Sequence, residues 1–180
     1  TPASLAVQAA RLGYAVVCVG RVEEGGAPIS STRIRERVEA GDMEAAAEML
    51  GRRYAAAGRV EPGKRMGRTL GFPTLNLAWD PPLRPRLGVY LVRVRSTADE
   101  SWQPAVANYG LRPTVEAAVA PRLEVHVLGP CVWAEGDAVE VEWLEFVRPE
   151  RKFAGLPDLT AQIAADVVSA RSWFSGREIR

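Results

Sequence analysis

The chain contains 180 residues, of which 47% are hydrophobic and 25% are charged. This composition is typical of one substantial folded domain with a small appendage, and it argues against a disordered chain. The 23 basic and 22 acidic side chains leave a formal net charge of +1, so the sequence lacks the basic surplus that favours binding to nucleic acid.

The apolar stretches are short, and Tyr14 to Val19 is far below the length that spans a bilayer. The first residues also do not follow the pattern of a secretory signal. We therefore expect a cytoplasmic protein without membrane partners. Cys18 and Cys131 each lie in an apolar stretch, which predicts core positions and not a disulfide framework or a zinc site.

The N-terminal segment predicts a helix over Leu5 to Leu12 that leads into a strand over Tyr14 to Val22. The chain begins at Thr1 and not at Met, so we expect that it was cut from something longer. Unpaired apolar residues in such a fragment favour self-association.

Two short helices are predicted next. Ser30 is a candidate N-cap for the first helix, and Gly41 is its expected end. Asp42 is the candidate N-cap of the second helix, and Gly51 is its expected end. After Arg53 the sequence changes from helical patterns to short alternating runs. This change places the expected domain boundary between residues 1–52 and 53–180.

Short alternating runs separated by Gly and Pro follow this boundary. Six strands are predicted, over Tyr54 to Val60, Phe72 to Leu77, Val89 to Arg95, Gln103 to Asn108, Leu123 to Leu128 and Ala138 to Val147. Strands at this spacing are typical of a closed antiparallel barrel. The fold class is therefore mainly β.

A final helix is predicted over Leu156 to Phe174, and we expect it to lie against the barrel. Its apolar stripe consists of Leu159, Ile163, Val167 and Phe174, whereas Gln162, Asp166 and Arg171 are assigned to the other faces.

The segment Gly58 to Gly71 contains four glycines and four basic residues between two predicted strands. Glycine lets backbone N–H groups approach an anion closely, and Lys and Arg supply charge, so this loop is a candidate for wrapping phosphates. A solvated hairpin rich in Gly and Arg explains the same residues. The segment is not a Walker A loop, because its Lys64 is not followed by Ser or Thr.

Thr74 and Asn76 are candidate ligands of Mg²⁺. Pro73 forces Phe72 into an extended conformation, so Thr74 and Asn76 are expected two positions apart on one strand face. Mg²⁺ needs only one or two protein oxygens when phosphates and water supply the rest. The alternative is a strand entry in which both side chains satisfy local hydrogen bonds.

Glu124 is a candidate general base. Leu123, Val125 and Val127 form one strand face, so Glu124 and His126 are expected to project from the other. A carboxylate on a rigid strand is able to accept the proton of a hydroxyl that attacks phosphorus. A solvent-facing Glu is the alternative, and for His126 packing or hydrogen bonding is the favoured role.

Taken in order, these segments resemble the riboflavin kinase family, and in particular the C-terminal part of bacterial bifunctional riboflavin kinase/FMN adenylyltransferases (FAD synthetases). The motifs are GRTLGFPTLNL at 67–77, GVY at 88–90, NYGLRPT at 108–114, LEVHVL at 123–128 and FVRPERKF at 146–153. The family motif most often has Ala at the position of Leu75, and we expect that difference to affect only packing.

The resemblance implies a six-stranded Greek-key barrel with a C-terminal helix, and an enzyme that phosphorylates riboflavin to FMN with ATP and Mg²⁺. It assigns Glu124 as the base and Thr74 and Asn76 as ligands of the metal and the ATP phosphates. The other implied ATP-binding residues are Gly58, Gly63, Lys64, Gly67, Arg68 and Gly71. Asn108 and Arg148 are implied to bind the flavin or to close the site.

The segment from Ile29 to Glu36 resembles the end of the adenylyltransferase domain, where Ser31, Thr32 and Arg33 would be the remnant of a phosphate site at a helix N-terminus. The nucleotide motif of that domain needs two histidines, whereas this chain contains only His126. We therefore expect no FMN adenylylation.

Two other functions stay open at this point. One is a barrel that holds a flavin or a nucleotide without turnover, which predicts binding in the absence of product. A barrel that binds nucleic acid would need exposed aromatic platforms and a basic groove, and the balanced charge disfavours it.

Overall fold

The computed structural model describes residues 1–63, 66–111 and 121–177. The helices are α1 (Pro2–Leu12), α2 (Ser31–Ala40), α3 (Met43–Leu50), α4 (Met66–Thr69) and α5 (Leu156–Phe174). The strands are β1 (Glu23–Glu24), β2 (Ala27–Pro28), β3 (Ala55–Glu61), β4 (Leu75–Ala78), β5 (Gly88–Ser96), β6 (Gln103–Leu111), β7 (Pro121–Val127) and β8 (Ala138–Arg148).

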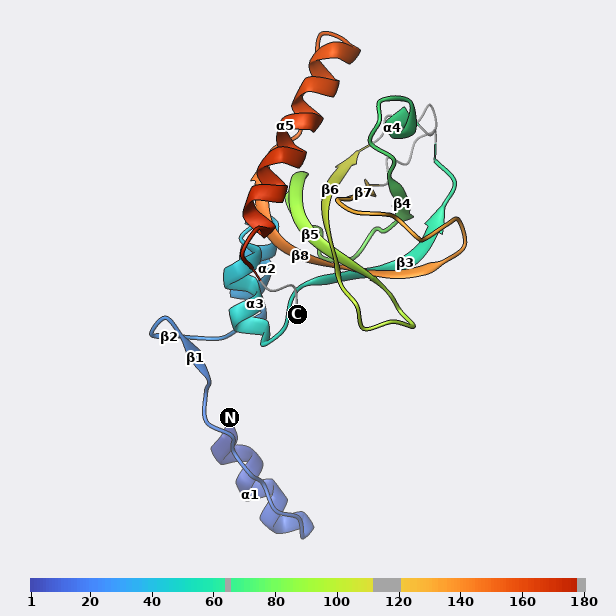
Figure 1. Ribbon diagram of the computed structural model, residues 1–180. Coiled ribbons are helices and arrows are strands. Elements are labelled where there is room, and N and C mark those ends of the chain that lie inside the picture. Colours follow the sequence, from blue (N-terminus) through green and yellow to red (C-terminus); the bar gives the residue numbers. More distant parts are fainter. Residues whose placement is uncertain (64–65, 112–120, 178–180) are drawn as a thin grey trace.

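Strands β3 to β8 form a closed barrel in the order β3-β4-β7-β6-β5-β8, and every neighbouring pair is antiparallel (Figure 1). The barrel closes because β3 pairs with β4 at one edge and with β8 at the other. The predicted six-stranded antiparallel barrel with a C-terminal helix is confirmed. The predicted strand over Phe72 to Leu77 begins later, at Leu75.

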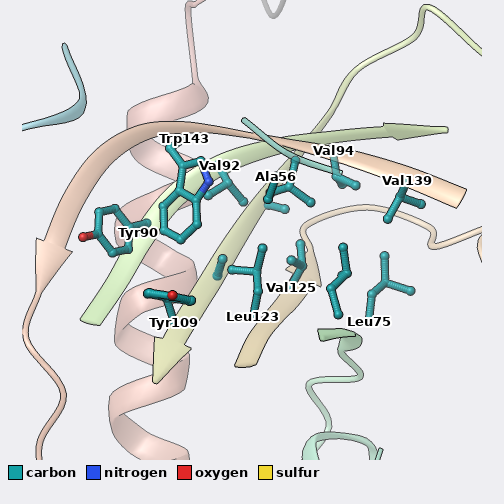
Figure 2. Packing of buried hydrophobic residues seen from close by; sticks show 14 of the residues in the cluster. Ala56, Leu75, Tyr90, Val92, Val94, Tyr109, Leu123, Val125, Val139 and Trp143 are labelled. Carbon is teal, nitrogen blue, oxygen red and sulfur yellow. The ribbon is translucent and has the colours of Figure 1, made fainter. Parts of the chain in front are cut away.

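Every second side chain along the strands points inward, and these side chains fill the barrel interior. In β7, Leu123, Val125 and Val127 are buried while the residues between them are only half-buried, as expected for a strand with one face in the core. Leu75 also points inward, and the expectation that its difference from the family motif affects only packing stays a prediction. Figure 2 shows Leu75, Leu123 and Val125 together with Tyr90, Tyr109 and Trp143.

Aromatic rings occupy one end of this core. The Tyr90 and Trp143 ring centroids lie 4.7 Å apart at an interplanar angle of 85°, and the Tyr109 ring meets Trp143 at 90°. Such edge-to-face contacts add stability beyond the burial of apolar area. Burial raises the pKa of the Tyr109 phenol to about 12, and it raises the pKa of Tyr90 further.

Helix α5 lies on the outside of the barrel beside β5 and β6 (Figure 1). Its buried apolar residues Val167, Ala170 and Phe174 pack in a second core on outward side chains of the strands, such as Leu91 and Val106. These contacts come from the C-terminal half of the helix. One prediction for α5 was wrong: Asp166, which was placed outside the apolar stripe, is buried at 7% exposure.

Helices α2 and α3 begin and end as predicted. The side chain of Ser30 accepts a hydrogen bond from the Arg33 N–H, and that of Asp42 accepts one from the Ala45 N–H. Gly41 and Gly51 end the two helices in the left-handed conformation, with φ of 83° and 67°, which glycine adopts at little cost. Buried side chains of both helices, Val38, Met43 and Ala46, join the core of the barrel. The division at residue 52 stays a prediction.

The predicted strand over Tyr14 to Val22 is not formed, and Val17 and Val19 are 85% and 88% exposed. A strand needs a neighbour to satisfy its backbone groups, and residues 14–22 pair with no strand in the described part of the chain. The prediction of buried cysteines was also wrong, because Cys18 and Cys131 are both exposed. Cys18 lies in this unpaired segment, and Cys131 lies in the connection after β7.

Candidate active site

A cleft of about 770 Å³ lies on the outer face of the barrel, bounded by the α4 loop on one side and by α5 on the other. Its described lining residues are Pro62, Gly63, Met66, Gly67, Leu70, Phe72, Thr74, Val89, Val106, Asn108, Arg122, Glu124, His126, Arg148, Glu150, Arg151, Phe153, Leu159, Ile163, Asp166 and Val167. The cleft therefore combines an apolar wall with a smaller set of convergent polar groups, as ligand sites commonly do.

A single row of cross-strand partners crosses the sheet under this cleft. Asn76 of β4 lies opposite Glu124 of β7, and Glu124 lies opposite Asn108 of β6. The row continues from Asn108 to Val89 of β5 and from Val89 to Arg148 of β8. Directly opposite residues have Cβ atoms about 4.5–5.5 Å apart. The structure thus brings together four residues that lie far apart in the sequence and were each singled out there.

Thr74 and Asn76 flank Leu75, whose side chain points into the barrel. Thr74 lines the cleft, and Asn76 is buried at its edge with 7% exposure. The Asn76 amide Nδ2 donates to the Thr74 carbonyl oxygen at 3.4 Å. That hydrogen bond leaves the Asn76 Oδ1 atom and the Thr74 hydroxyl as the oxygens for a hard cation.

Gly63 covers Asn76. A Cβ atom added at Gly63 would lie 2.3 Å from the Asn76 Nδ2 atom, so no larger residue fits there without displacing the amide. A Cβ atom added at Gly67 would likewise lie 2.3 Å from the Phe72 carbonyl oxygen. The loop is therefore folded closely over the residues that were predicted to hold the metal.

Other residues of the predicted phosphate loop are placed differently. Gly58 lies within β3 opposite Val139 and does not line the cleft. Arg68 is exposed on α4, and Gly71 is exposed with φ of 86°. Lys64 lies outside the described residues. Among the five of these loop residues that the structure describes, Gly63 and Gly67 line the cleft.

His126 also lines the cleft, but its ring is engaged by the chain itself. Its Nδ1 atom lies 2.8 Å from the Pro73 carbonyl oxygen, and the ring meets Phe72 edge to face at 5.6 Å between centroids. These contacts match the packing and hydrogen-bonding role that the sequence favours for His126. They also tie β7 to the segment that carries Thr74.

Two acidic residues of the cleft were missed at the level of sequence. Glu150 follows β8 and accepts a hydrogen bond from the Asn108 Nδ2 atom at 3.4 Å, while its carboxylate lies against Gly110. Asp166 of α5 forms an ion pair with Arg148 at 2.7 Å. The position of Asp166 between the stripe residues Ile163 and Val167 is the signal that could have revealed it.

The predicted remnant site at the start of α2 lies apart from the cleft. Ser31 and Thr32 are exposed there. The Arg33 guanidinium donates to the carbonyl oxygens of Ala27 and Pro28, each at 2.7 Å. Arg33 therefore holds the β1–β2 hairpin, and phosphate binding by the three residues stays a prediction.

The described residues contain no group of three or more His, Cys, Asp or Glu side chains that could hold a metal ion. The negative charge that balances a cation in this cleft would come mainly from a phosphorylated ligand. Nor does any helix in the described parts of the chain have the length and apolar character needed to cross a membrane.

The closed barrel and its partly apolar, partly polar cleft have the form of a domain for small-molecule ligands. Residues 50–174 match the model of the Flavokinase family, described as riboflavin kinase. The chain belongs to the riboflavin kinase family.

Relatives support the same assignment. A bifunctional riboflavin kinase/FMN adenylyltransferase of Escherichia coli strain K12 is 38% identical over 162 residues, covering 90% of this chain and 51% of that protein. A protein of the same description from Haemophilus influenzae is 41% identical over 147 residues, covering 82% and 47% of the two chains. The chain thus spans about half the length of the curated relatives it matches.

Among solved structures, a Streptococcus pneumoniae protein described as a macrolide-efflux protein has a TM-score of 0.79 and 33% sequence identity. The match covers 89% of this chain and 52% of that one. The barrel and its flanking helices therefore recur in a longer chain.

Proposed function

We propose that this chain transfers the γ-phosphate of ATP to the 5′-hydroxyl of the ribityl chain of riboflavin, which gives FMN and ADP. The observation that carries the proposal is the row Asn76–Glu124–Asn108 under a cleft whose far wall is apolar. Membership of the riboflavin kinase family supports the same reaction.

The cleft has the two ends that this substrate requires. Val89 and Val106 from the barrel and Ile163 from α5 supply apolar surface for a flat aromatic ring system. Thr74, Asn108 and Glu124 supply polar groups at the other end. The ribityl chain of riboflavin would join the two ends, with its terminal hydroxyl directed toward Glu124.

Glu124 is proposed as the general base. As the ribityl oxygen forms its bond to the γ-phosphorus, the hydroxyl proton passes to the Glu124 carboxylate and the bond between the γ-phosphorus and the bridging oxygen breaks, so that ADP leaves. The rigid β7 strand fixes the direction of the carboxylate. Such positioning supplies much of the catalysis in phosphoryl transfer.

Thr74 and Asn76 are proposed to hold Mg²⁺ through their side-chain oxygens. When bound, the cation neutralises charge on the transferred phosphate and on the leaving ADP. The close fit of Gly63 over Asn76 supports this placement, because it keeps the amide fixed in the wall of the cleft. Lys64 and Arg68 are proposed to add positive charge around the phosphates, and Gly58 and Gly71 to shape the same loop.

We also propose that FMN adenylylation is not carried by this chain. The expected nucleotide motif needs two histidines, and the single histidine of the sequence, His126, lies against Pro73 in the barrel. Residues 1–52 are proposed to belong to the end of an adenylyltransferase domain.

The test is incubation of the purified chain with riboflavin, ATP and Mg²⁺, followed by chromatographic separation of the flavins and nucleotides. The proposal predicts equal amounts of FMN and ADP, and no FMN when Mg²⁺ is chelated. Tight binding of riboflavin without any FMN would instead identify a flavin-binding barrel that lacks catalysis.

A further inference from the structure

The two walls of the cleft are connected by a buried ion pair that the proposed chemistry does not use. Arg148 at the end of β8 donates to the Asp166 carboxylate of α5 from Nε at 3.1 Å and from Nη2 at 2.7 Å. The side chains are 18% and 7% exposed. A charge pair at this depth depends on complete hydrogen bonding, because neither partner is well solvated.

The hydrogen-bonding capacity of this carboxylate is largely used. Gln162, one turn earlier in α5, donates from Nε2 to the Asp166 Oδ1 atom at 2.6 Å. The third nitrogen of the Arg148 guanidinium, Nη1, donates to the Pro149 carbonyl oxygen at 3.1 Å. The planar fork of Arg148 is therefore held at all three nitrogens, which fixes its direction as well as its position.

The backbone of Arg148 is fixed too. Arg148 pairs with Val89 in the sheet, and the register between β5 and β8 shifts immediately afterwards. Gly88, with φ of 154°, lies so close that an added Cβ would be 2.4 Å from the Arg148 carbonyl oxygen. The ion pair thus connects α5 to a rigid point of the barrel.

On α5 the ion pair lies between the anchored and the open part of the helix. The residues of α5 that are buried on the barrel lie at 166–174. Leu159 and Ile163, on the N-terminal side, line the cleft and are only half-buried. The described contacts include one other polar bond between α5 and the barrel, from Trp173 Nε1 to the Glu145 carboxylate near the C-terminal end of the helix. The bond at Asp166 is therefore the polar contact nearest to Leu159 and Ile163 among the described residues.

We propose that Asp166 is a positioning residue that sets the width of the flavin slot, by holding Arg148 and with it both α5 and the segment 149–153. The inference rests on the proposed function for the identity of the ligand. A planar ring gains its binding energy from close contact on both faces. A wall that shifts by a fraction of an ångström therefore lowers the affinity for riboflavin and leaves the phosphate end unchanged.

The test compares Asp166→Asn with the wild type in steady-state kinetics. The expected result is a KM for riboflavin raised by about tenfold or more, which corresponds to about 1.4 kcal/mol, with kcat and the KM for ATP within about twofold of wild type. Asp158→Asn, an exposed carboxylate on the same helix, is the matched control and should change none of these values. Equal effects on both substrates, or a lower melting temperature alone, would reduce the pair to a general structural role and overturn the inference.

A milder variant covers the case in which Asp166→Asn does not fold. Gln162→Leu removes one hydrogen bond and keeps the ion pair, and it should shift the KM for riboflavin in the same direction by a smaller factor. An unchanged KM for riboflavin in a folded Gln162→Leu protein would then count against the inference.

Amide hydrogen exchange separates this inference from the proposed function. In Asp166→Asn, or in Gln162→Leu to a smaller extent, residues 149–163 should exchange faster while β3 keeps its protection, whether or not the wild type phosphorylates riboflavin. If the wild type makes no FMN but the variant still exchanges faster, the coupling of the two walls is supported and the kinase proposal is contradicted. Unchanged exchange would remove the positioning role.

Discussion

Asn76 and Glu124 lie directly opposite each other on the antiparallel strands β4 and β7, although 47 residues separate them in the sequence. Glu124 in turn lies opposite Asn108 on β6. The proposed metal ligand and the proposed base are therefore neighbours on one rigid sheet. A carboxylate on the opposite wall of the barrel would have been incompatible with phosphoryl transfer.

The contact between Gly63 and Asn76 predicts the effect of Gly63→Ala. The added methyl group would lie 2.3 Å from Asn76 Nδ2, so the amide must move, at a stability cost of about 1–3 kcal/mol. We expect the KM for ATP to rise more than the KM for riboflavin, measured by varying each substrate in turn. Gly129→Ala, where a Cβ meets nothing within 4 Å, should behave as wild type, and equal behaviour of the two variants would contradict the proposed role of Asn76.

Metal dependence tests the proposed role of Thr74. Thr74→Ala removes a hydroxyl that lines the cleft, and the Mg²⁺ concentration for half-maximal rate should rise by about tenfold. The measurement is a Mg²⁺ titration at saturating riboflavin and ATP. Thr97→Ala, at an exposed turn after β5, is the control. A titration curve that does not shift in Thr74→Ala would exclude this hydroxyl as a ligand.

The buried phenol of Tyr109 predicts a loss of stability in alkali. Burial raises its pKa from 10 to about 12, so between these values the unfolded chain gives up a proton that the folded chain retains. The free energy of unfolding is therefore constant below about pH 10 and falls as the pH approaches 12. Urea unfolding from pH 8 to 11.5 measures this slope.

Tyr109→Phe should flatten that slope. Its hydroxyl has no hydrogen-bond partner among the described residues, so the variant should lie within about 1 kcal/mol of wild type at pH 7, on the stable side if it differs. Tyr14→Phe, at an exposed position, is the control. A slope that stays as steep in Tyr109→Phe would assign the alkaline loss to other groups, with buried Tyr90 as the next candidate.

Much of the barrel was predictable because it depends on local patterns. The alternation of Leu123, Val125 and Val127 determines which face of β7 is buried. It therefore places Glu124 on the outer face, independently of which strands lie beside β7. The caps at Ser30 and Asp42 were predictable for the same reason, since each bond joins residues three positions apart. Confirmed predictions of this kind need no tertiary information.

The remaining features depend on contacts between distant segments. Helical periodicity places Asp166 beside the apolar stripe, but it does not identify the partner of its carboxylate, because Arg148 comes from another element. The row from Asn76 to Arg148 depends on the strand order, which no single strand pattern specifies. The sequence pattern predicts a strand over Tyr14 to Val22, but a strand also requires a partner to pair with.

The most direct test of the account is a single-turnover comparison of the wild type with Glu124→Gln. Each protein is present in excess over riboflavin, with saturating ATP and Mg²⁺. The substitution keeps the size of the side chain and removes its ability to accept the proton. We predict that FMN formation slows by about 100-fold or more while riboflavin binding is retained, and that Glu140→Gln, on the outer face of β8 in an ion pair with Arg95, reacts at nearly the wild-type rate. FMN formation at the wild-type rate in Glu124→Gln would contradict the central claim that this carboxylate is the base.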